Sequence, residues 1–188
     1  MRIYLIRHGE TDANKEMIIQ GRANNPLNDT GIWQAKKTGE YLKKQDIDFD
    51  LCVTSPLSRS IDTANIIKET LGLELNNQIE TEIIERDFGA FDGKQIDSSY
   101  YHMVHSGQVE GIETDQVIEE RVKKFFIDFF KTNHHKNVLM VAHSHVIKAL
   151  LVQYLPEFDY DTYLSNCCIN IIDFDQTILI KNYNINPL

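Results

Sequence analysis

Apolar residues follow two patterns along the chain: short continuous runs, and a spacing of three and four positions. The continuous runs predict strands. Short runs rich in Ile, Val and Leu are typical of strands that are buried on both faces of a sheet. Such runs lie at 3–6, 51–54 and 138–141, and weaker strand-like sequence lies near 79–84. Two further runs, Cys167–Phe174 and Thr177–Tyr183, are separated by Asp175-Gln176 and predict a hairpin.

The second pattern, a spacing of three and four positions, predicts helices over 29–45, 56–71 and 115–132, and another that ends near Leu155. We expect Asn28 to cap the first helix, whose apolar face includes Ile32. Ser55 is expected to cap the second, because Pro56 suits the first helical position. In the third, Val117 and Phe125 are expected to point inward with the other apolar residues.

Strands that alternate with helices indicate an α/β protein with a mainly parallel sheet and an antiparallel hairpin at its edge. No linker divides the chain, so we expect a single domain over residues 1–188. The polar, glycine-containing stretch 86–112 lacks a clear period. We expect it to be a partly ordered excursion over the sheet that partially caps a site.

Composition narrows the classes of partner. The net charge of -9 argues against binding to nucleic acid, which needs a basic surface. No apolar run approaches the length of about 18 residues that spans a membrane, and no leader precedes the first strand, so we expect a cytoplasmic protein. Three cysteines cannot all pair within one chain and are interpreted as reduced thiols. The oligomeric state is left open.

Histidine and arginine residues, which are common in catalytic and anion-binding sites, follow three of the predicted strands. The first strand ends in Arg7-His8, the second precedes Arg59 by about one helical turn, and the third ends at His143. The carboxyl ends of parallel strands meet at one edge of a sheet, so these side chains should converge there. Glu85, which follows the strand-like stretch 79–84, could join them.

These residue types suit phosphoryl transfer. The planar fork of arginine makes paired, charge-assisted hydrogen bonds to phosphate, and Arg59 also lies in the first turn of a predicted helix, where an anion is favoured. The same positive charge lowers the pKa of a nearby imidazole and keeps it neutral, as a nucleophile must be. A carboxylic acid such as Glu85 can protonate the departing alcohol if its pKa is raised.

The segment Leu5-Ile6-Arg7-His8-Gly9-Glu10-Thr11 resembles the signature of the histidine phosphatase superfamily, whose members are similar to phosphoglycerate mutase. Further blocks resemble that family in the same order along the chain: Asn14; Gly21; Pro26-Leu27-Asn28-Asp29-Thr30-Gly31; Ser55-Pro56-Leu57-Ser58-Arg59; Glu85-Arg86-Asp87-Phe88-Gly89; Gly111-Ile112-Glu113-Thr114; Arg121; and Val141-Ala142-His143. The resemblance covers residues 1 to about 151. It implies a three-layer α/β/α sandwich.

The resemblance also implies roles for individual residues. His8 would become phosphorylated, Arg7, Arg59 and His143 would hold the phosphoryl oxygens, and Glu85 would act first as acid and then as base. Further substrate-binding candidates are Asn14, Gln20, Gly21, Arg86 and Ser144, although Asn14 and Gln20 could instead serve the turn that contains them. No metal or organic cofactor is required.

The sequence departs from the family pattern at a few positions. Ser144 stands where glycine usually follows the second histidine, and it could alter how the backbone approaches the phosphate. Asn25 and Asn28 replace the common aspartate and threonine, and both changes look structural. No catalytic group is lost.

Other interpretations of the same residues remain open. His143 and His145 could be a pair of metal ligands, but a helix is predicted to begin there and no third ligand is evident. Tyr100, Tyr101 and His102 could contact a substrate, although packing is the simpler role. We expect His102, His105, His134 and His135 at exposed loop or helix-end positions.

The leading functional hypothesis is a phosphomonoesterase that acts on a small phosphorylated metabolite. His143 follows Glu85 by 58 positions, and phosphoglycerate mutases of this family have a longer segment there. Residues 94–116 contain Lys94 and no other Lys or Arg, so basic residues that would hold a substrate carboxylate have no clear match in that segment. The alternatives are a phosphoglycerate mutase and a catalytically weak domain that binds phospho-ligands. Residues 92–112 are expected to determine specificity.

Overall fold

A six-stranded sheet forms the centre of the computed structural model, which describes residues 1–133 and 137–188. Its strand order is β3-β2-β4-β1-β5-β6. Strands β1 (Arg2–Arg7), β2 (Leu51–Thr54), β3 (Asn77–Ile79) and β4 (Asn137–Ala142) run parallel. The hairpin of β5 (Ile169–Asp175) and β6 (Thr177–Ile185) adds the antiparallel edge. The predicted mainly parallel α/β sheet with a hairpin edge is confirmed.

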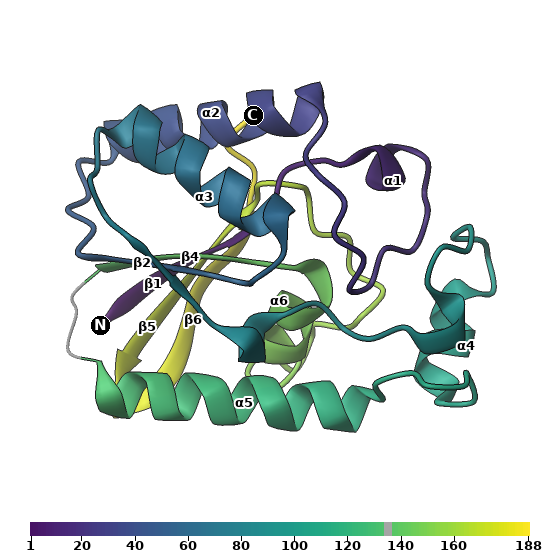
Figure 1. Cartoon of the computed structure of the whole chain (residues 1–188). Coiled ribbons are helices and arrows are strands. Elements are labelled where there is room, and N and C mark those ends of the chain that lie inside the picture. The colour runs from purple at the N-terminus through teal and green to yellow at the C-terminus, as the bar shows by residue number, and fades with distance from the viewer. Residues whose placement is uncertain (134–136) are drawn as a thin grey trace.

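Helices cover both faces of the sheet (Figure 1). One face carries α2 (Asp29–Lys44) and α3 (Ser58–Leu71), and the other carries α5 (Asp115–Thr132) and α6 (Ser144–Leu151). The central strand β1 has Ile3 and Leu5 in one apolar cluster and Tyr4 and Ile6 in the other. Successive side chains of a strand point to opposite faces, which explains why this run is continuously apolar.

Helix α3 begins two residues later than predicted, and Ser55 is not its cap. The N-cap is Leu57, which makes no side-chain hydrogen bond. The Ser55 hydroxyl lies 2.7 Å from Nε2 of His143 instead. Ser55 therefore makes a hydrogen bond to a residue far away in the sequence instead of capping the helix that follows it. The predicted cap at Asn28 is confirmed, since its side chain accepts from Gly31 N.

Three further expectations differ from the structure. The strand expected near 79–84 is the short β3, followed by the 3-10 helix η1 (Thr81–Ile83). Val117 is 52% exposed and Ile32 is 37% exposed, although both were expected to face inward. In α5 the buried stripe starts at Ile118 and continues through Val122 and Phe125, and Val117 lies one helical step, about 100°, off this stripe.

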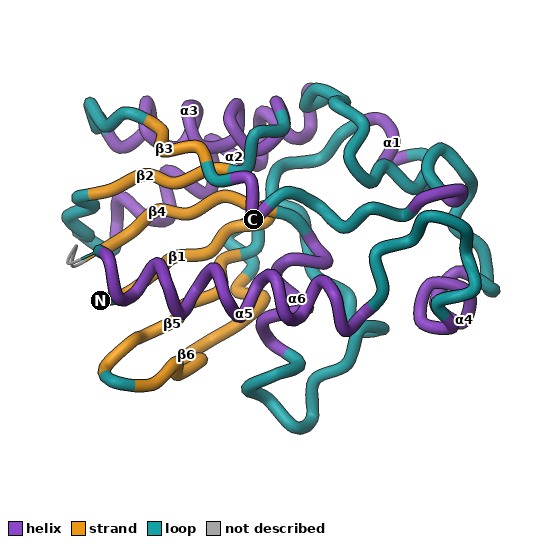
Figure 2. Tube along the Cα trace, turned by 60° about the horizontal axis from the view of Figure 1, so that its bottom comes forward, coloured by secondary structure: helices purple, strands orange, loops and turns teal. Residues whose placement is uncertain are grey.

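The stretch 86–112 is more ordered than its sequence suggests. It contains the 3-10 helix η2 (Gly89–Phe91) and helix α4 (Tyr100–Ser106). Backbone hydrogen bonds fasten it to residues 17–19, for example from Ile96 N to Met17 O at 2.7 Å. Figure 2 shows α4 and the short α1 (Asp12–Lys15) beyond the carboxyl ends of the parallel strands.

A few remaining expectations concern single residues and membranes. His102 is exposed and His105 is half-buried, while His134 and His135 lie outside the described residues. Among the described residues, no helix is both long and apolar enough to cross a lipid bilayer.

Candidate active site

His8 and His143 follow the ends of two adjacent strands. Arg7, the last residue of β1, pairs in register with Ala142, the last residue of β4. The two histidines come directly after this pair, and the centroids of their rings are 5.2 Å apart. Strand register thus brings together two side chains that are 135 positions apart in the sequence, as the strand-end argument predicted.

One nitrogen of the His8 ring, Nε2, is free of a proton. Its Nδ1 lies 2.7 Å from the carbonyl oxygen of Gly9. A carbonyl can only accept, so Nδ1 donates and Nε2 keeps its lone pair. Burial, followed by the charges of Arg59 and Arg7, holds the pKa of His8 well below its ordinary value of 6.5. His8 is therefore neutral at physiological pH and lines the cavity described below.

Gly9 allows the backbone to pass very close to helix α2. A Cβ added at Gly9 would lie 2.6 Å from the carbonyl oxygen of Gly31, which is rigid backbone. Gly9 N also donates to Thr63 Oγ1 of α3 at 3.0 Å. The segment that carries His8 is thus fixed between two helices, and only glycine fits at the next position without displacement.

Two arginines bring positive charge to His8. Arg59 is 1% exposed, and its guanidinium donates to the carbonyls of Ala23 at 2.6 Å and Gly21 at 2.8 Å. Desolvation lowers the pKa of Arg59 to about 10, so it remains charged. Arg7 donates from Nη1 to the carbonyl of Leu164. Both side chains line the cavity, and the buried Nε of each has no hydrogen-bond partner among the described residues.

His143 is held by two serines. Its Nε2 lies 2.7 Å from Ser55 Oγ and 3.3 Å from Ser60 Oγ. Burial, then the charges of Arg59 and neighbouring groups, holds its pKa well below the ordinary 6.5. The buried Nδ1 of His143 has no hydrogen-bond partner among the described residues. No hydrogen bond to another described residue would have to break for this nitrogen to bind a ligand.

Glu85 combines burial with fixed hydrogen bonds. Its Oε1 accepts from the backbone N–H groups of Arg86 at 2.9 Å and His145 at 3.2 Å. Desolvation raises the pKa of this carboxyl above its ordinary value, although the Arg86 N–H bond and the charges of Arg59 and Arg7 oppose the rise. A carboxyl in this state can hold a proton nearer to neutral pH than an exposed one.

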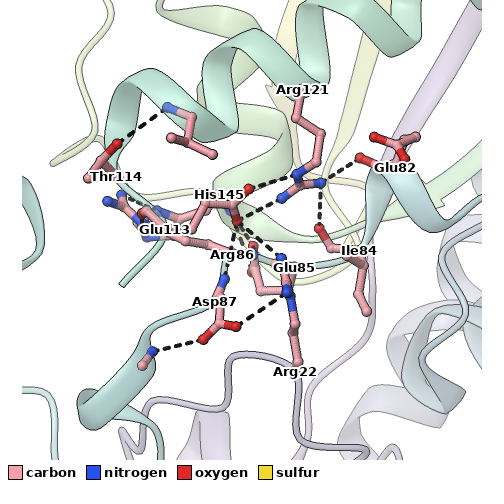
Figure 3. A network of polar contacts seen from close by, with 12 residues as sticks. Arg22, Glu82, Ile84, Glu85, Arg86, Asp87, Glu113, Thr114, Arg121 and His145 are labelled. Atoms are coloured by element: carbon pink, nitrogen blue, oxygen red, sulfur yellow. Dashed lines mark hydrogen bonds and ion pairs between the residues drawn. The ribbon is translucent and has the colours of Figure 1, made fainter. Parts of the chain in front are cut away.

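A polar network fixes the segment that carries Glu85 (Figure 3). Arg121 donates to the carbonyl of Ile84 at 3.1 Å and pairs with the Glu113 carboxylate at 2.7 Å. From the other side, Arg22 donates to the carbonyl of Glu85 at 3.2 Å. The backbone at Glu85 is thus held by Arg121 and Arg22, from two distant parts of the chain, which limits the positions that its carboxyl can take.

A cavity of about 350 Å³ opens at this edge of the sheet, and His8, Arg7, Arg59 and Glu85 line it. The other predicted substrate-binding residues that line it are Asn14, Gln20, Gly21 and Ser144.

Arg86 differs from these residues, because it does not line the cavity and is fully buried. It donates to the carbonyl of Glu113 at 2.7 Å and to Asp115 Oδ1 at 2.6 Å. His143 likewise is not among the residues that line the cavity, and its ring centroid lies 5.2 Å from that of His8.

The cavity includes residues that sequence reasoning did not single out. Asn166, which precedes β5, donates to the carbonyl of His8 at 3.1 Å. Lys148 of α6 lines the wall. His145 was considered only as a metal ligand, and Tyr100 mainly as packing, yet Tyr100 Oη lies 3.1 Å from His145 Nε2 in that wall. The sequence does carry a signal for Lys148, because this lysine interrupts an otherwise apolar helical stretch. A lysine is rarely buried unless its charge has a partner.

A metal centre finds no support in the described part of the chain. Residues 1–133 and 137–188 contain no group of three or more His, Cys, Asp or Glu side chains placed to hold an ion. His145 itself is buried, and its backbone N–H faces Glu85. The arrangement instead offers a neutral imidazole, two arginines and a buried carboxylic acid around one cavity, which suits attack on a phosphate ester.

Comparison with known proteins agrees with this chemistry. The sequence profile of the "Histidine phosphatase superfamily (branch 1)" matches residues 3–185. The chain is 37% identical over 191 residues to "Uncharacterized phosphatase PhoE" of Bacillus subtilis, covering 98% of this chain and 94% of that protein. It is 28% identical to "Probable phosphoglycerate mutase GpmB" of Salmonella choleraesuis, covering 94% of this chain and 86% of that protein. The solved structure of the alpha-ribazole phosphatase from Shigella flexneri superposes with a TM-score of 0.84 at 27% identity, covering 99% of this chain and 97% of that chain.

Proposed function

Because the chain belongs to the histidine phosphatase superfamily (branch 1), we propose that it is a phosphomonoesterase that hydrolyses a small phosphorylated metabolite through a phosphohistidine at His8. The observation that carries the proposal is the state of His8. It is neutral, its Nε2 is unprotonated, and it lines a cavity together with Arg7, Arg59 and Glu85.

In the first step, the Arg7 and Arg59 guanidinium groups hold the phosphoryl oxygens and offset their charge. Nε2 of His8 attacks phosphorus, a P–N bond forms, and the P–O bond to the alcohol breaks. The carboxyl proton of Glu85 passes to the departing oxygen. The Nδ1 atom of His143 becomes a donor to the phosphoryl group when that ring carries a proton there.

In the second step, the Glu85 carboxylate takes a proton from a water molecule as its oxygen attacks phosphorus. The P–N bond breaks, inorganic phosphate leaves, and both His8 and Glu85 return to their starting states. The fixed position of the Glu85 carboxyl, held by two backbone N–H groups, serves both steps. No metal ion or organic cofactor takes part in this scheme.

Two features favour hydrolysis over phosphoglycerate mutation. The relative with 37% identity is named a phosphatase. The segment between Glu85 and His143 is short for a mutase of this family, and residues 94–116 supply a single cation, Lys94. A less enclosed site gives water better access to the phosphohistidine.

The stretch 86–112 has its own place in the proposal, as a partial cap on the single domain. Phe88, Ile96, Tyr100 and Tyr101 from this stretch line the cavity. They would contact the alcohol part of the ester. The three cysteines are free thiols, which fits the cytoplasmic location that we also propose.

The test is phosphate release from a panel of phosphomonoesters, with His8→Ala as the matched control. The parent protein should release phosphate from at least one ester, and His8→Ala should release none. Brief incubation of the parent with a ³²P-labelled ester should give label on His8 that acid removes and base does not.

Two results would redirect the proposal. Interconversion of 2- and 3-phosphoglycerate faster than phosphate release would assign a mutase. Binding of phosphate without turnover of any ester would assign a binding domain.

A further inference from the structure

One buried cation in the cavity wall has no part in the phosphoryl chemistry above. Lys148 is 4% exposed and lines the same cavity as His8. It lies four residues after Ser144 on α6, so the two side chains share one helix face. Ser144 also lines the cavity. The helix that follows the second histidine therefore places a cation on the wall, next to the proposed phosphoryl site.

Lys148 has no carboxylate in direct contact, although Glu85, Asp161 and Asp159 lie near enough to raise its pKa. Its Nζ donates to the carbonyl of Tyr160, and it lies 5.7 Å from the centroid of the Tyr101 ring. Among the described residues, no carboxylate lies within 4.0 Å of this nitrogen. An ammonium group has three N–H donors. The contact with Tyr160 uses one of them.

A purely structural role explains these contacts poorly. One hydrogen bond to the Tyr160 carbonyl could fix the loop after α6, but burial of a full charge for one neutral acceptor is costly. Desolvation and the charge of Arg7 lower the pKa of Lys148 to about 8, so the group is still largely protonated at neutral pH. A buried cation with no carboxylate in direct contact is a candidate site for an anionic ligand.

The sum of the charges around the cavity also indicates that Lys148 is suited to bind an anion. Arg7 and Arg59 contribute two positive charges, His8 is neutral, and Glu85 is a proton donor in the first step. A phosphoryl dianion balances the two arginines. Lys148 then remains as a further positive charge in the wall, and Asp159 and Asp161, the other carboxylates that act on it, are exposed to solvent.

We propose that Lys148 binds a second anionic group, carried by the alcohol part of the ester, and that the preferred substrates are phosphate monoesters with a carboxylate or a second phosphate. This inference rests on the proposed function, because it takes the cavity as the substrate site. It also moves the main specificity contact from 92–112, where the sequence suggested it, to helix α6.

Pairs of esters that differ in one group provide the test. O-phosphoserine and O-phosphoethanolamine differ by a carboxylate, and fructose 1,6-bisphosphate and fructose 6-phosphate differ by a phosphate. The parent should favour the anionic member of at least one pair in kcat/KM, and Lys148→Met should remove about 10- to 100-fold of that preference, the usual value of a hydrogen bond to a charged group. The pair that responds identifies the second group.

Two variants control for other effects of the substitution. Lys148→Arg keeps a cation and should keep much of the preference. Lys94→Met removes the exposed lysine of the 94–116 segment, which does not line the cavity, and should leave the preference unchanged. Turnover of the less charged ester of each pair should stay within about threefold in Lys148→Met, which shows that the variant is folded.

The results separate the inference from the proposed function. An equal loss for both members of each pair, or an unchanged preference in Lys148→Met, would overturn the role of Lys148 even if phosphate is released. If the parent hydrolyses no ester, calorimetry with His8→Ala and His8→Ala/Lys148→Met still reports binding. Tighter binding of O-phosphoserine than of O-phosphoethanolamine that disappears without Lys148 would then support the inference alone, and equal binding would overturn it as well.

Discussion

A shift from pH 7.5 to pH 5.5 should destabilise this protein through its buried histidines. His8, His143 and His145 are 3%, 0% and 4% exposed, and desolvation is the largest cause that holds the pKa of each well below 6.5. The unfolded chain takes up a proton at each ring as the pH falls below about 6.5, and the folded chain does not. The contribution of these neutral rings to the free energy of unfolding is therefore fully present above this pH and is lost as the pH falls below it.

The size of the loss follows from the number of rings. At pH 5.5, one unit below the ordinary histidine pKa, each ring lowers the free energy of unfolding by about 1.4 kcal/mol. The three rings together lower it by up to about 4 kcal/mol. Glu85 opposes this change. Because its folded pKa is raised, it binds a proton in the folded state first, and this stabilises the fold as the pH falls. A domain with about 5–15 kcal/mol of stability should remain folded at pH 5.5.

Urea unfolding at the two pH values, at constant ionic strength, measures the difference. His145→Gln should reduce the loss by about 1.4 kcal/mol, since glutamine does not titrate. His102→Gln, at an exposed position, should leave it unchanged. Glu85→Gln removes the opposing contribution and should show the largest loss. Equal stability of Glu85→Gln at both pH values would refute the view that these rings are buried in the neutral form.

Further predictions concern the chemistry and the close packing beside it. Glu85→Gln should lower kcat/KM for alkyl phosphates by about 10²- to 10⁴-fold and for p-nitrophenyl phosphate far less, because nitrophenolate leaves without a proton; equal losses for both esters would remove the acid role. The parent should lose kcat/KM for alkyl esters as the pH rises through the raised pKa of Glu85, and a pH profile of Glu85→Gln should lack this alkaline limb. Gly9→Ala should cost about 1–3 kcal/mol in urea unfolding, since its Cβ would meet the Gly31 carbonyl at 2.6 Å; unchanged stability and activity would show that the backbone there is free to move. EDTA should leave phosphate release unchanged, and an activity restored by a divalent ion would contradict the metal-free scheme.

The sequence predicted the features that depend on strands and their ends. A continuous apolar run such as 3–6 is typical of a strand covered on both faces, and parallel strands bring their carboxyl ends to one edge. The proximity of His8 and His143 follows from these two facts and from the Arg7–Ala142 register. The family was predictable for a similar reason, because its motifs are short and local.

Features set by contacts between distant segments were not predictable. Ser55 stands in a sequence that is typical of a helix cap, but its hydroxyl makes a hydrogen bond to His143 instead. Arg86 lies in a motif that suggested substrate binding, and its donors are used by Glu113 and Asp115 instead. Helix α4 has no clear period, since its order depends on packing of Tyr100 with Ile19 and Phe88.

The position of β1 in the sheet has a consequence for how the protein forms. β1 lies between β4 and β5, with pairs such as Ile6–Val141 and Ile6–Ile169. During synthesis β1 therefore waits for both partners: Val141 follows Ile6 by 135 residues (141 - 6) and Ile169 follows it by 163 (169 - 6). Contacts of such long range slow folding. Asn166 and the Leu164 carbonyl, which hold His8 and Arg7, are made after β4 and shortly before β5. A nascent chain should thus acquire activity only after Asn166 and β5 have been made, because these residues complete the surroundings of His8 and of β1.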